Sequence, residues 1–322
     1  MNVTLEEIAK QIKAVKTATV YTHMRPDGDA FGSALSLSAA LSRLGIENEV
    51  VNESDPPSNL LFLEKIKTVK KKPSRPSELT IAVDSADVLR LGALSDTFMA
   101  AGKKTPTINL DHHISNTRYA EFNYVRECAA NCMNVATLIA LLGVPFDKEI
   151  ATYLALGLLT DSGNFSHDDV GEEAFTLAAK LAAAGADFKT LNYELFKRQS
   201  KARAGLYAAV TGKMRYALDD RFAFLVITRE LMERYGADNG MTEGFVDFPL
   251  SVDGVEIAAS IMEVKKGQYK ISLRSKEIAD VNGVASVYGG GGHVRAAGCM
   301  LFGELEDVVD RLTYTVSQYL PS

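Results

Sequence analysis

Strand-like apolar runs alternate with helical stretches through the first 190 residues of the chain, and this alternation most restricts the fold. The strand-like runs are short and rich in β-branched residues, and they span residues 17–23, 47–52, 78–87 and 105–113. The stretches with helical periodicity span residues 2–15, 30–46, 132–143, 148–161 and 171–187. This order is typical of parallel sheets, because consecutive parallel strands need a crossover connection. We therefore expect an α/β domain with a parallel sheet and helices on both faces.

The pattern changes near residues 190–207. Beyond them, turn signals separate three strand-like segments, which span residues 215–228, 255–264 and 267–276. A chain of 322 residues is long enough for two domains. The sequence therefore predicts an N-terminal domain of residues 1–190, a linker of residues 191–207 and a smaller α+β domain of residues 208–322.

Composition and charge restrict the partners and the compartment. The net charge of −6 argues against binding to long duplex nucleic acid, although bound metal ions could still attract a short anionic substrate. The basic segment 65–76 is interpreted as a solvated loop, and alternatively as a region that draws in such a substrate. Three cysteines are too few for a disulfide framework and indicate a reducing compartment. With no recognisable signal peptide or bilayer-length apolar run, we expect a cytoplasmic protein without membrane contact.

The turn after the first strand, within "THMRPDGDAFGS", places His23, Asp27 and Asp29 within seven residues. Gly28 is expected to free the backbone between the two aspartates. Two carboxylates so close repel each other unless a cation lies between them. Asp29 could instead cap the following helix, but that would leave His23 and Asp27 unexplained.

Other acids and imidazoles follow later elements at the same expected edge of the sheet. Asp84 ends the third strand, His112 and His113 follow the fourth, and Asp161 ends a helix, where a positive charge would be more favourable. Asp84 alone could simply start a turn. Because the carboxyl ends of parallel strands share one edge, these side chains can converge.

Imidazole and carboxylates without a thiolate suit Mn²⁺ or a similar divalent ion. Six ligands fit a pair of ions about 3.5–4 Å apart that shares one or two aspartates, which is an arrangement suited to displacement at phosphorus. The predicted metal ligands are His23, Asp27, Asp29, Asp84, His112 and Asp161. His113 is then free to reach a phosphate oxygen.

The second domain contains "YGGGGHVRAAG", residues 288–298. Consecutive glycines let backbone N–H groups approach an anion, and we expect His293 at or near a helix start. A flexible loop is the alternative, and Arg274, in "SLRSK", could be an ordinary exposed arginine. Together these residues predict a phosphate clamp, which consists of Arg274, Gly290, Gly291, Gly292 and His293.

Four segments, "HMRPDGDAFGS", "DSAD", "DHHISNT" and "TDSGNF", resemble the four motifs of the DHH phosphoesterase superfamily. "SLRS" and "GGGGHVRAAG" resemble its DHH-associated C-terminal domain. All motifs appear in order over nearly the whole chain, which most resembles the nano-RNase branch. That resemblance implies a Mn²⁺-dependent enzyme that removes 5′-mononucleotides from the 3′ ends of very short oligoribonucleotides. Many members also dephosphorylate 3′-phosphoadenosine 5′-phosphate (pAp).

The resemblance also implies roles for single residues. The six predicted ligands match the family's metal ligands, with Asp84 as the bridge, and Asp111 orients the neighbouring histidine. His113 meets the scissile phosphate, so His112, His113 and Asp111 form the expected catalytic group. Arg274 and His293 hold another phosphate of the substrate. The active site is then expected in a cleft between the two domains.

Three positions depart from the family pattern: Ser162, His167 and Asn134. They leave open the substrate preference. A pAp phosphatase and a phosphodiesterase for cyclic or linear dinucleotides remain alternatives. A catalytically inactive nucleotide-binding module is a third, although such proteins typically lose metal ligands. A homodimer is one assembly that the sequence allows.

Overall fold

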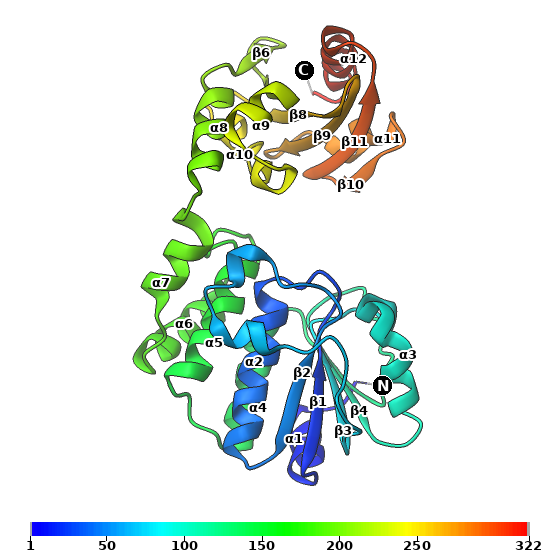
Figure 1. Ribbon diagram of the computed structural model, residues 1–322, viewed down its shortest axis with the longest axis vertical. Coiled ribbons are helices and arrows are strands. Elements are labelled where there is room, and N and C mark those ends of the chain that lie inside the picture. The colour runs from blue at the N-terminus through cyan, green and yellow to red at the C-terminus, as the bar shows by residue number, and fades with distance from the viewer. Residues whose placement is uncertain (1, 321–322) are drawn as a thin grey trace. The chain divides into compact units, whose positions relative to one another are not determined.

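The computed structural model describes residues 2–320 (Figure 1). The chain divides into two compact units at the bond between Arg198 and Gln199. This point lies inside the segment 191–207, which is largely helical. Helix α7 (Phe188–Asn192) continues into a π-helical turn (Tyr193–Lys197), and three residues separate this turn from α8 (Lys201–Thr211).

The first unit is built on a five-stranded sheet in the order β2-β1-β3-β4-β5, and all of its strand pairs are parallel. Its strands are β1 (Thr17–Tyr21), β2 (Glu47–Val51), β3 (Leu79–Val83), β4 (Thr107–Asp111) and β5 (Phe122–Val125). The strand order reverses beside β1, so the carboxyl ends of β1 and β3 border a ligand-binding position that is typical of open α/β sheets. Strand β5 was not predicted, because it has four residues and only one of them is buried.

Helices cover both faces of this sheet, as predicted. They are α1 (Leu5–Lys13), α2 (Gly28–Arg43), α3 (Ser95–Ala101), α4 (Asn131–Leu142), α5 (Lys148–Asp161), α6 (Glu172–Ala183) and α7. The main core joins one face of the sheet to α1, α2, α4 and α5. A smaller cluster joins the other face to α3 and the 3₁₀ segment η3 (Val88–Leu94). Two further 3₁₀ segments, η1 (Ser58–Leu60) and η2 (Glu64–Thr68), lie between β2 and β3.

Helices α2 and α5 pack very closely because glycines line their contact. A Cβ atom on Gly32 would lie 2.6 Å from the carbonyl oxygen of Tyr153, and one on Gly28 would lie 2.4 Å from Cγ2 of Thr160. The expectation that Gly28 frees the backbone is wrong, because its φ is not positive and the glycine instead admits Thr160. This close approach brings the end of α5 beside the start of α2.

The second unit has a six-stranded sheet in the order β10-β11-β9-β8-β7-β6, in which only β7 and β8 are parallel. Its strands are β6 (Arg215–Ala217), β7 (Phe222–Ile227), β8 (Ile257–Lys265), β9 (Gln268–Ser275), β10 (Gly291–His293) and β11 (Ala296–Phe302). Its helices are α8, α9 (Arg229–Tyr235), α10 (Asp247–Leu250), α11 (Val281–Ser286) and α12 (Leu305–Ser317), with a 3₁₀ segment η5 (Asn239–Thr242). This confirms the predicted α+β class.

The glycine run differs from its prediction. His293 does not start a helix but ends β10, which pairs antiparallel with β11. A Cβ atom on Gly290 would lie 2.2 Å from the carbonyl oxygen of Gly298, and one on Gly292 would lie 2.4 Å from that of Ala296. The glycines therefore let one strand of a hairpin pack against the other, and the alternative of a flexible loop is wrong.

Candidate active site

His23 follows β1 and is almost fully buried. Its Nδ1 lies 2.9 Å from the carbonyl oxygen of Met24. Because a carbonyl only accepts, Nδ1 carries a hydrogen, and Nε2 faces Oδ2 of Asp84 at 3.6 Å and Oδ2 of Asp27 at 3.8 Å. A ring nitrogen held this way between two carboxylates suits a proton or a metal ion.

Asp27, and not Asp29, is the N-cap of α2. Its Oδ1 accepts hydrogen bonds from the backbone N–H groups of Asp29 and Ala30, both at 3.0 Å. The helix therefore begins at Gly28, two residues earlier than it would if Asp29 were the N-cap. One oxygen of Asp27 holds the helix, and the other faces His23.

Asp29 is turned inward and fully buried. Its two oxygens accept hydrogen bonds from the backbone N–H groups of Asn131 and Cys132, which lie more than one hundred residues away at the start of α4. The N-cap residue of that helix, Ala130, offers no side-chain acceptor. Gly157 of α5 admits the carboxylate, because a Cβ atom there would lie 2.4 Å from Oδ1. Asp29 thus joins α2, α4 and α5 at the site.

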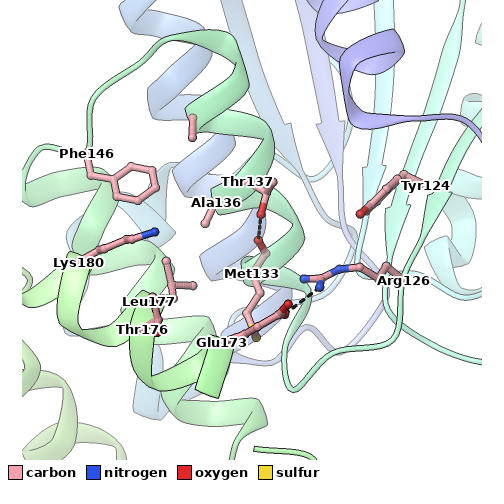
Figure 2. A pocket seen from close by; sticks show the side chains of 11 residues that line it. Tyr124, Arg126, Met133, Ala136, Thr137, Phe146, Glu173, Thr176, Leu177 and Lys180 are labelled. Atoms are coloured by element: carbon pink, nitrogen blue, oxygen red, sulfur yellow. Dashed lines mark hydrogen bonds and ion pairs between the residues drawn. The ribbon is translucent and has the colours of Figure 1, made fainter. Parts of the chain in front are cut away.

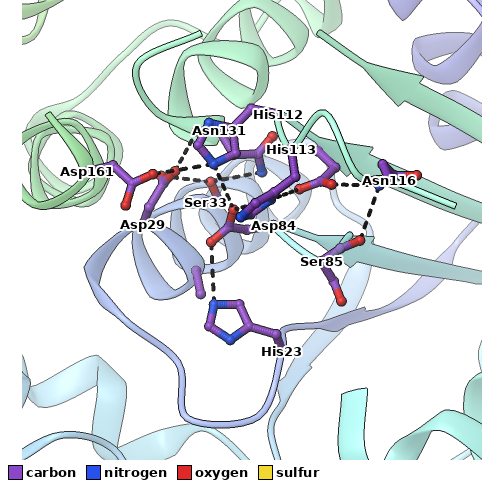
Figure 3. Close-up of polar contacts among 12 residues, drawn as sticks. His23, Asp29, Ser33, Asp84, Ser85, His112, His113, Asn116, Asn131 and Asp161 are labelled. Atoms are coloured by element: carbon purple, nitrogen blue, oxygen red, sulfur yellow. Dashed lines mark hydrogen bonds and ion pairs between the residues drawn. The ribbon is translucent and has the colours of Figure 1, made fainter. Parts of the chain in front are cut away.

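Asp84 lies at the centre of the cluster (Figure 3). It follows β3 in the left-handed region, with φ of 54°, a conformation that costs energy in a non-glycine residue and is often found at functional sites. Its Oδ1 lies 3.4 Å from Nε2 of His112, while its Oδ2 faces His23. Among residues 2–320, this Oδ1 is buried and has no hydrogen-bond partner. A buried carboxylate oxygen without a partner destabilises the folded chain unless a cation binds it. The residues present therefore fit a metal ion.

His112 and Asp161 complete the cluster. Nδ1 of His112 lies 2.9 Å from the carbonyl oxygen of Cys128, which turns Nε2 toward Oδ2 of Asp161 at 3.3 Å. A carbonyl on the far nitrogen is the usual way in which a metal-binding imidazole is oriented. Ligand atoms within 4.8 Å of one another form three groups: His23, Asp27 and Asp84; Asp29, His112 and Asp161; and Asp84, His112 and His113. The structure therefore brings all six predicted ligands together.

His113 differs from the other two histidines because a carboxylate holds its Nδ1. Oδ1 of Asp111 lies 2.8 Å away, and Asp111 is fully buried. Oδ2 of Asp111 accepts a hydrogen bond from Nδ2 of Asn116 at 2.6 Å. Asn116 is itself buried and donates to Oδ1 of Asn109 at 2.8 Å. Sequence reasoning missed both asparagines, although Asn116 stands three residues after the paired histidines.

The carboxylates are too crowded to be all ionised without a cation. Burial and the charge of Asp84 raise the pKa of Asp29 to about 8. Burial and the charges of Asp29 and Asp84 raise the pKa of Asp161 to about 9. Burial alone would lower the pKa of His112, but Asp84 and Asp29 raise it to about 10. Protons therefore occupy the metal-free cluster at neutral pH, and a divalent cation would displace them.

A pH dependence of metal stabilisation follows. Asp161 has a higher pKa in the folded than in the unfolded chain, so metal-free stability falls as pH rises between about 4 and about 9. We expect the thermal midpoint in EDTA to fall from pH 6 to pH 8, and the increase caused by excess Mn²⁺ to grow over the same range. Thermal unfolding with and without the ion checks this. An increase in the midpoint that is independent of pH would contradict proton displacement.

The three departures from the family pattern all contact the backbone. Nδ2 of Asn134 donates to the carbonyl oxygen of Asp111 at 3.2 Å, and Nδ1 of His167 lies 2.7 Å from that of Asp161. The hydroxyl of Ser162 accepts a hydrogen bond from the N–H of Phe165 at 3.0 Å. These side chains thus hold the segments that carry Asp111 and Asp161.

A separate cavity of about 470 Å³ lies between β5, α4 and α6 (Figure 2). Arg126 lines it and forms an ion pair with Glu173 at 2.8 Å. Nε of Arg126 also donates to Oδ1 of Asn134 at 2.9 Å. The guanidinium therefore supports the end of β4 through Asn134.

The predicted phosphate-binding residues lie in the second unit. Strand register places Ala296 of β11 opposite both Arg274 of β9 and His293 of β10, so these two residues flank one position of β11. Nε of Arg274 lies 3.9 Å from Oδ1 of Asp247. Arg274 also lines a cavity of about 420 Å³ together with Lys270. The arrangement offers cationic groups on one face of the sheet.

Comparisons with known proteins agree with this fold. The model of the DHH family N-terminal domain matches residues 17–158, and that of the DHHA1 domain matches residues 219–321. The chain belongs to the DHH family and is a phosphoesterase, which confirms the resemblance seen in the motifs.

Among curated relatives, the chain is 34% identical to the bifunctional oligoribonuclease and PAP phosphatase NrnA of Thermus thermophilus, over 97% of this chain and 93% of that protein. It is 26% identical to a probable protein of the same name from Streptococcus mutans, over 95% and 96%. An exopolyphosphatase-related protein of Bacteroides fragilis shares the fold, with a TM-score of 0.86 and 24% identity over 98% and 96% of the two chains. Among the described residues, no helix is long and apolar enough to cross a membrane.

Proposed function

We propose that the chain hydrolyses the phosphodiester bonds of short oligoribonucleotides and releases 5′-mononucleotides from their 3′ ends, with two divalent cations, Mn²⁺ first among them. The observation that carries this proposal is the position of Asp84, which turns one oxygen to His23 and the other, buried and unpartnered, to His112. The nitrogen and oxygen ligands, without thiolate, favour Mn²⁺. The names of the NrnA relatives support the substrate class.

Two ligand sets would fit the two cations. His23, Asp27 and Asp84 would hold one ion, while Asp29, His112 and Asp161 would hold the other. Asp84 also lies in a third group with His112 and His113, so it would stand between the two ions. When bound, such a pair activates a water molecule and stabilises an in-line displacement at phosphorus. The carbonyl partners of His23 and His112 fix the ring nitrogens in the required direction.

His113 acts on the phosphate and not on a cation. Its Nδ1–H is held by Asp111, which leaves Nε2 as the nitrogen that can donate to a phosphate oxygen. Asp111 would stabilise the protonated ring, and Asn116 prevents the carboxylate from turning away. The developing negative charge on the phosphate is then met by a preorganised donor.

The second candidate activity is dephosphorylation of pAp, because the curated relatives carry both activities in their names. The same cluster would act on the phosphate monoester. Arg274, His293 and the backbone of Gly290, Gly291 and Gly292 would hold the second phosphate. Three free cysteines fit a reducing compartment, and we place the reaction in the cytoplasm.

A substrate panel tests the proposed function. The full chain in Mn²⁺ is given 5′-labelled RNA of two, five and twenty-four nucleotides, and pAp in a parallel reaction. We expect the dimer and pentamer to be cleaved at least ~10²-fold more efficiently than the long RNA, which is a difference of about 3 kcal/mol in transition-state binding. Faster turnover of pAp than of the dimer would make the phosphatase the main activity. No turnover of any substrate would overturn the proposal.

A further inference from the structure

The arginines of the first unit divide into two sets. Four of its seven arginines form ion pairs with carboxylates, namely Arg43, Arg75, Arg126 and Arg198. The other three are Arg25, Arg90 and Arg118. Within residues 2–320, these three side chains have no ion pair, hydrogen bond or contact with an aromatic ring, and all three residues are exposed.

The unpaired arginines lie in the loops that carry the metal-ligand candidates. Arg25 follows β1, two residues after His23, while Arg90 lies in η3 after β3 and Arg118 follows β4. Hydrogen bonds connect these loops: Met24 N–H donates to the carbonyl oxygen of Arg90 at 2.6 Å, and Thr117 N–H donates to that of Ala86 at 2.8 Å. The three cations therefore border the same carboxyl edge of the sheet.

Hydrogen bonds fix the backbone at two of these arginines. The N–H of Arg25 donates to Oγ of Ser54 at 2.9 Å, and the N–H of Arg118 donates to Oδ1 of Asn116 at 2.7 Å. Both residues have positive φ, at 55° and 54°. These conformations are uncommon for a long side chain, so the loops hold both arginines in defined positions.

Carboxylates of the neighbouring loops are already engaged. Asp87 accepts the N–H of Leu89, Glu53 accepts that of Ala93, and Asp55 pairs with Lys71. The arginines thus keep their charge available for an external anion. In a chain with a net charge of −6, three such cations at one edge favour a polyanionic ligand there.

Each of these loops also exposes one large apolar side chain. Met24 is 42% exposed, Leu89 73% and Ile114 81%. A nucleotide offers a phosphate and an apolar base face together, whereas an inorganic polyphosphate offers charge alone.

We propose that Met24, Arg25, Leu89, Arg90, Ile114 and Arg118, named the arginine rim, bind the nucleotides that lie 5′ of the scissile phosphate. The arginines contact the phosphodiesters, and the apolar side chains pack against the bases. This inference rests on the proposed function and adds to it the residues that favour a pentamer over a dimer. Arginine suits this role because its planar guanidinium matches two phosphate oxygens.

The test is the salt dependence of kcat/KM for the Arg25→Gln, Arg90→Gln, Arg118→Gln triple variant with pentaadenylate and diadenylate. Each phosphate contact on a single strand contributes about −0.7 to the slope of log kcat/KM against log salt. For the pentamer, we expect the slope of the triple variant to be smaller in magnitude by about 2 than that of the wild type, and its KM to be ~10-fold higher. For the dimer, the decrease in slope should be smaller.

Arg75→Gln is the control for each single substitution, because it also removes one arginine charge, beside Glu47 at the amino edge of the sheet. It should leave both the slope and the KM for the pentamer unchanged. Ile114→Ser tests the apolar contact, and it should raise the KM for the pentamer without changing the slope. If the triple variant is unfolded by circular dichroism, the Arg90→Gln and Arg118→Gln single variants replace it.

The outcomes separate this inference from the proposed function. The wild-type chain could cleave both substrates while the folded arginine variants keep an unchanged slope and KM. That result would overturn the proposed role of the arginine rim and leave the proposed function standing. A wild-type chain that cleaves neither substrate would overturn the function itself.

Discussion

Replacing Asp84 by asparagine should lower kcat/KM for a short oligoribonucleotide by at least ~10³-fold, which corresponds to about 4 kcal/mol. The carboxylate is buried between His23 and His112, it belongs to two of the three groups of ligand atoms, and we propose that both cations share it. An amide carries no charge and offers one oxygen, so it cannot complete both cation positions. Steady-state kinetics in Mn²⁺ measures the loss, and thermal unfolding should show that Mn²⁺ no longer raises the midpoint as it does in the wild type.

Asp87→Asn provides the matched control in the same loop. Asp87 caps η3 by accepting the N–H of Leu89, and asparagine caps equally well. This variant should keep both activity and metal stabilisation. If Asp84→Asn retained activity within a factor of ~10, the central role of this carboxylate would be wrong.

Replacing His113 by alanine should lower kcat ~10²–10³-fold while leaving Mn²⁺ affinity close to that of the wild type. Its Nδ1 is held by Asp111 at 2.8 Å, and we therefore expect the ring to contact the phosphate and not a cation. His112→Ala should instead weaken Mn²⁺ binding, because His112 Nε2 faces Asp84 and Asp161. Calorimetric titration of metal into each variant, beside single-turnover kinetics, distinguishes the two roles.

Equal losses of Mn²⁺ affinity in the two histidine variants would contradict this division. Asp111→Asn adds an independent test. It should lower kcat ~10–100-fold, because the amide no longer stabilises the protonated ring of His113. If the Asp111→Asn, His113→Ala double variant has the same kcat as His113→Ala alone, the substitution of Asp111 has no effect without the His113 ring. That result would show that Asp111 acts through His113.

The sequence predicted the parallel sheet and the convergence of the candidate ligands because both depend on local pattern. An acid or imidazole that follows an apolar strand lies at the carboxyl edge whatever the helices do, so His23, Asp84 and His112 could be placed without coordinates. Asp161 could be placed as well, because α5 ends where its apolar periodicity ends.

What the sequence did not predict depends on contacts between distant segments. The hydrogen bonds that the start of α4 donates to the Asp29 carboxylate join residues more than one hundred positions apart. The role of Gly28 depends on where Thr160 of α5 lies. The β10–β11 hairpin was missed because glycine has a low propensity for strands. In this hairpin the glycines are needed because the two backbones approach too closely for a Cβ atom.

The measurement that tests the account most directly is the number of Mn²⁺ ions bound per chain, by calorimetric titration with elemental analysis of the dialysed complex. We predict two ions for the wild type, and loss of at least one in the Asp84→Asn variant. A wild-type chain that hydrolyses a diribonucleotide with one bound ion, or with none, would contradict the two-cation centre.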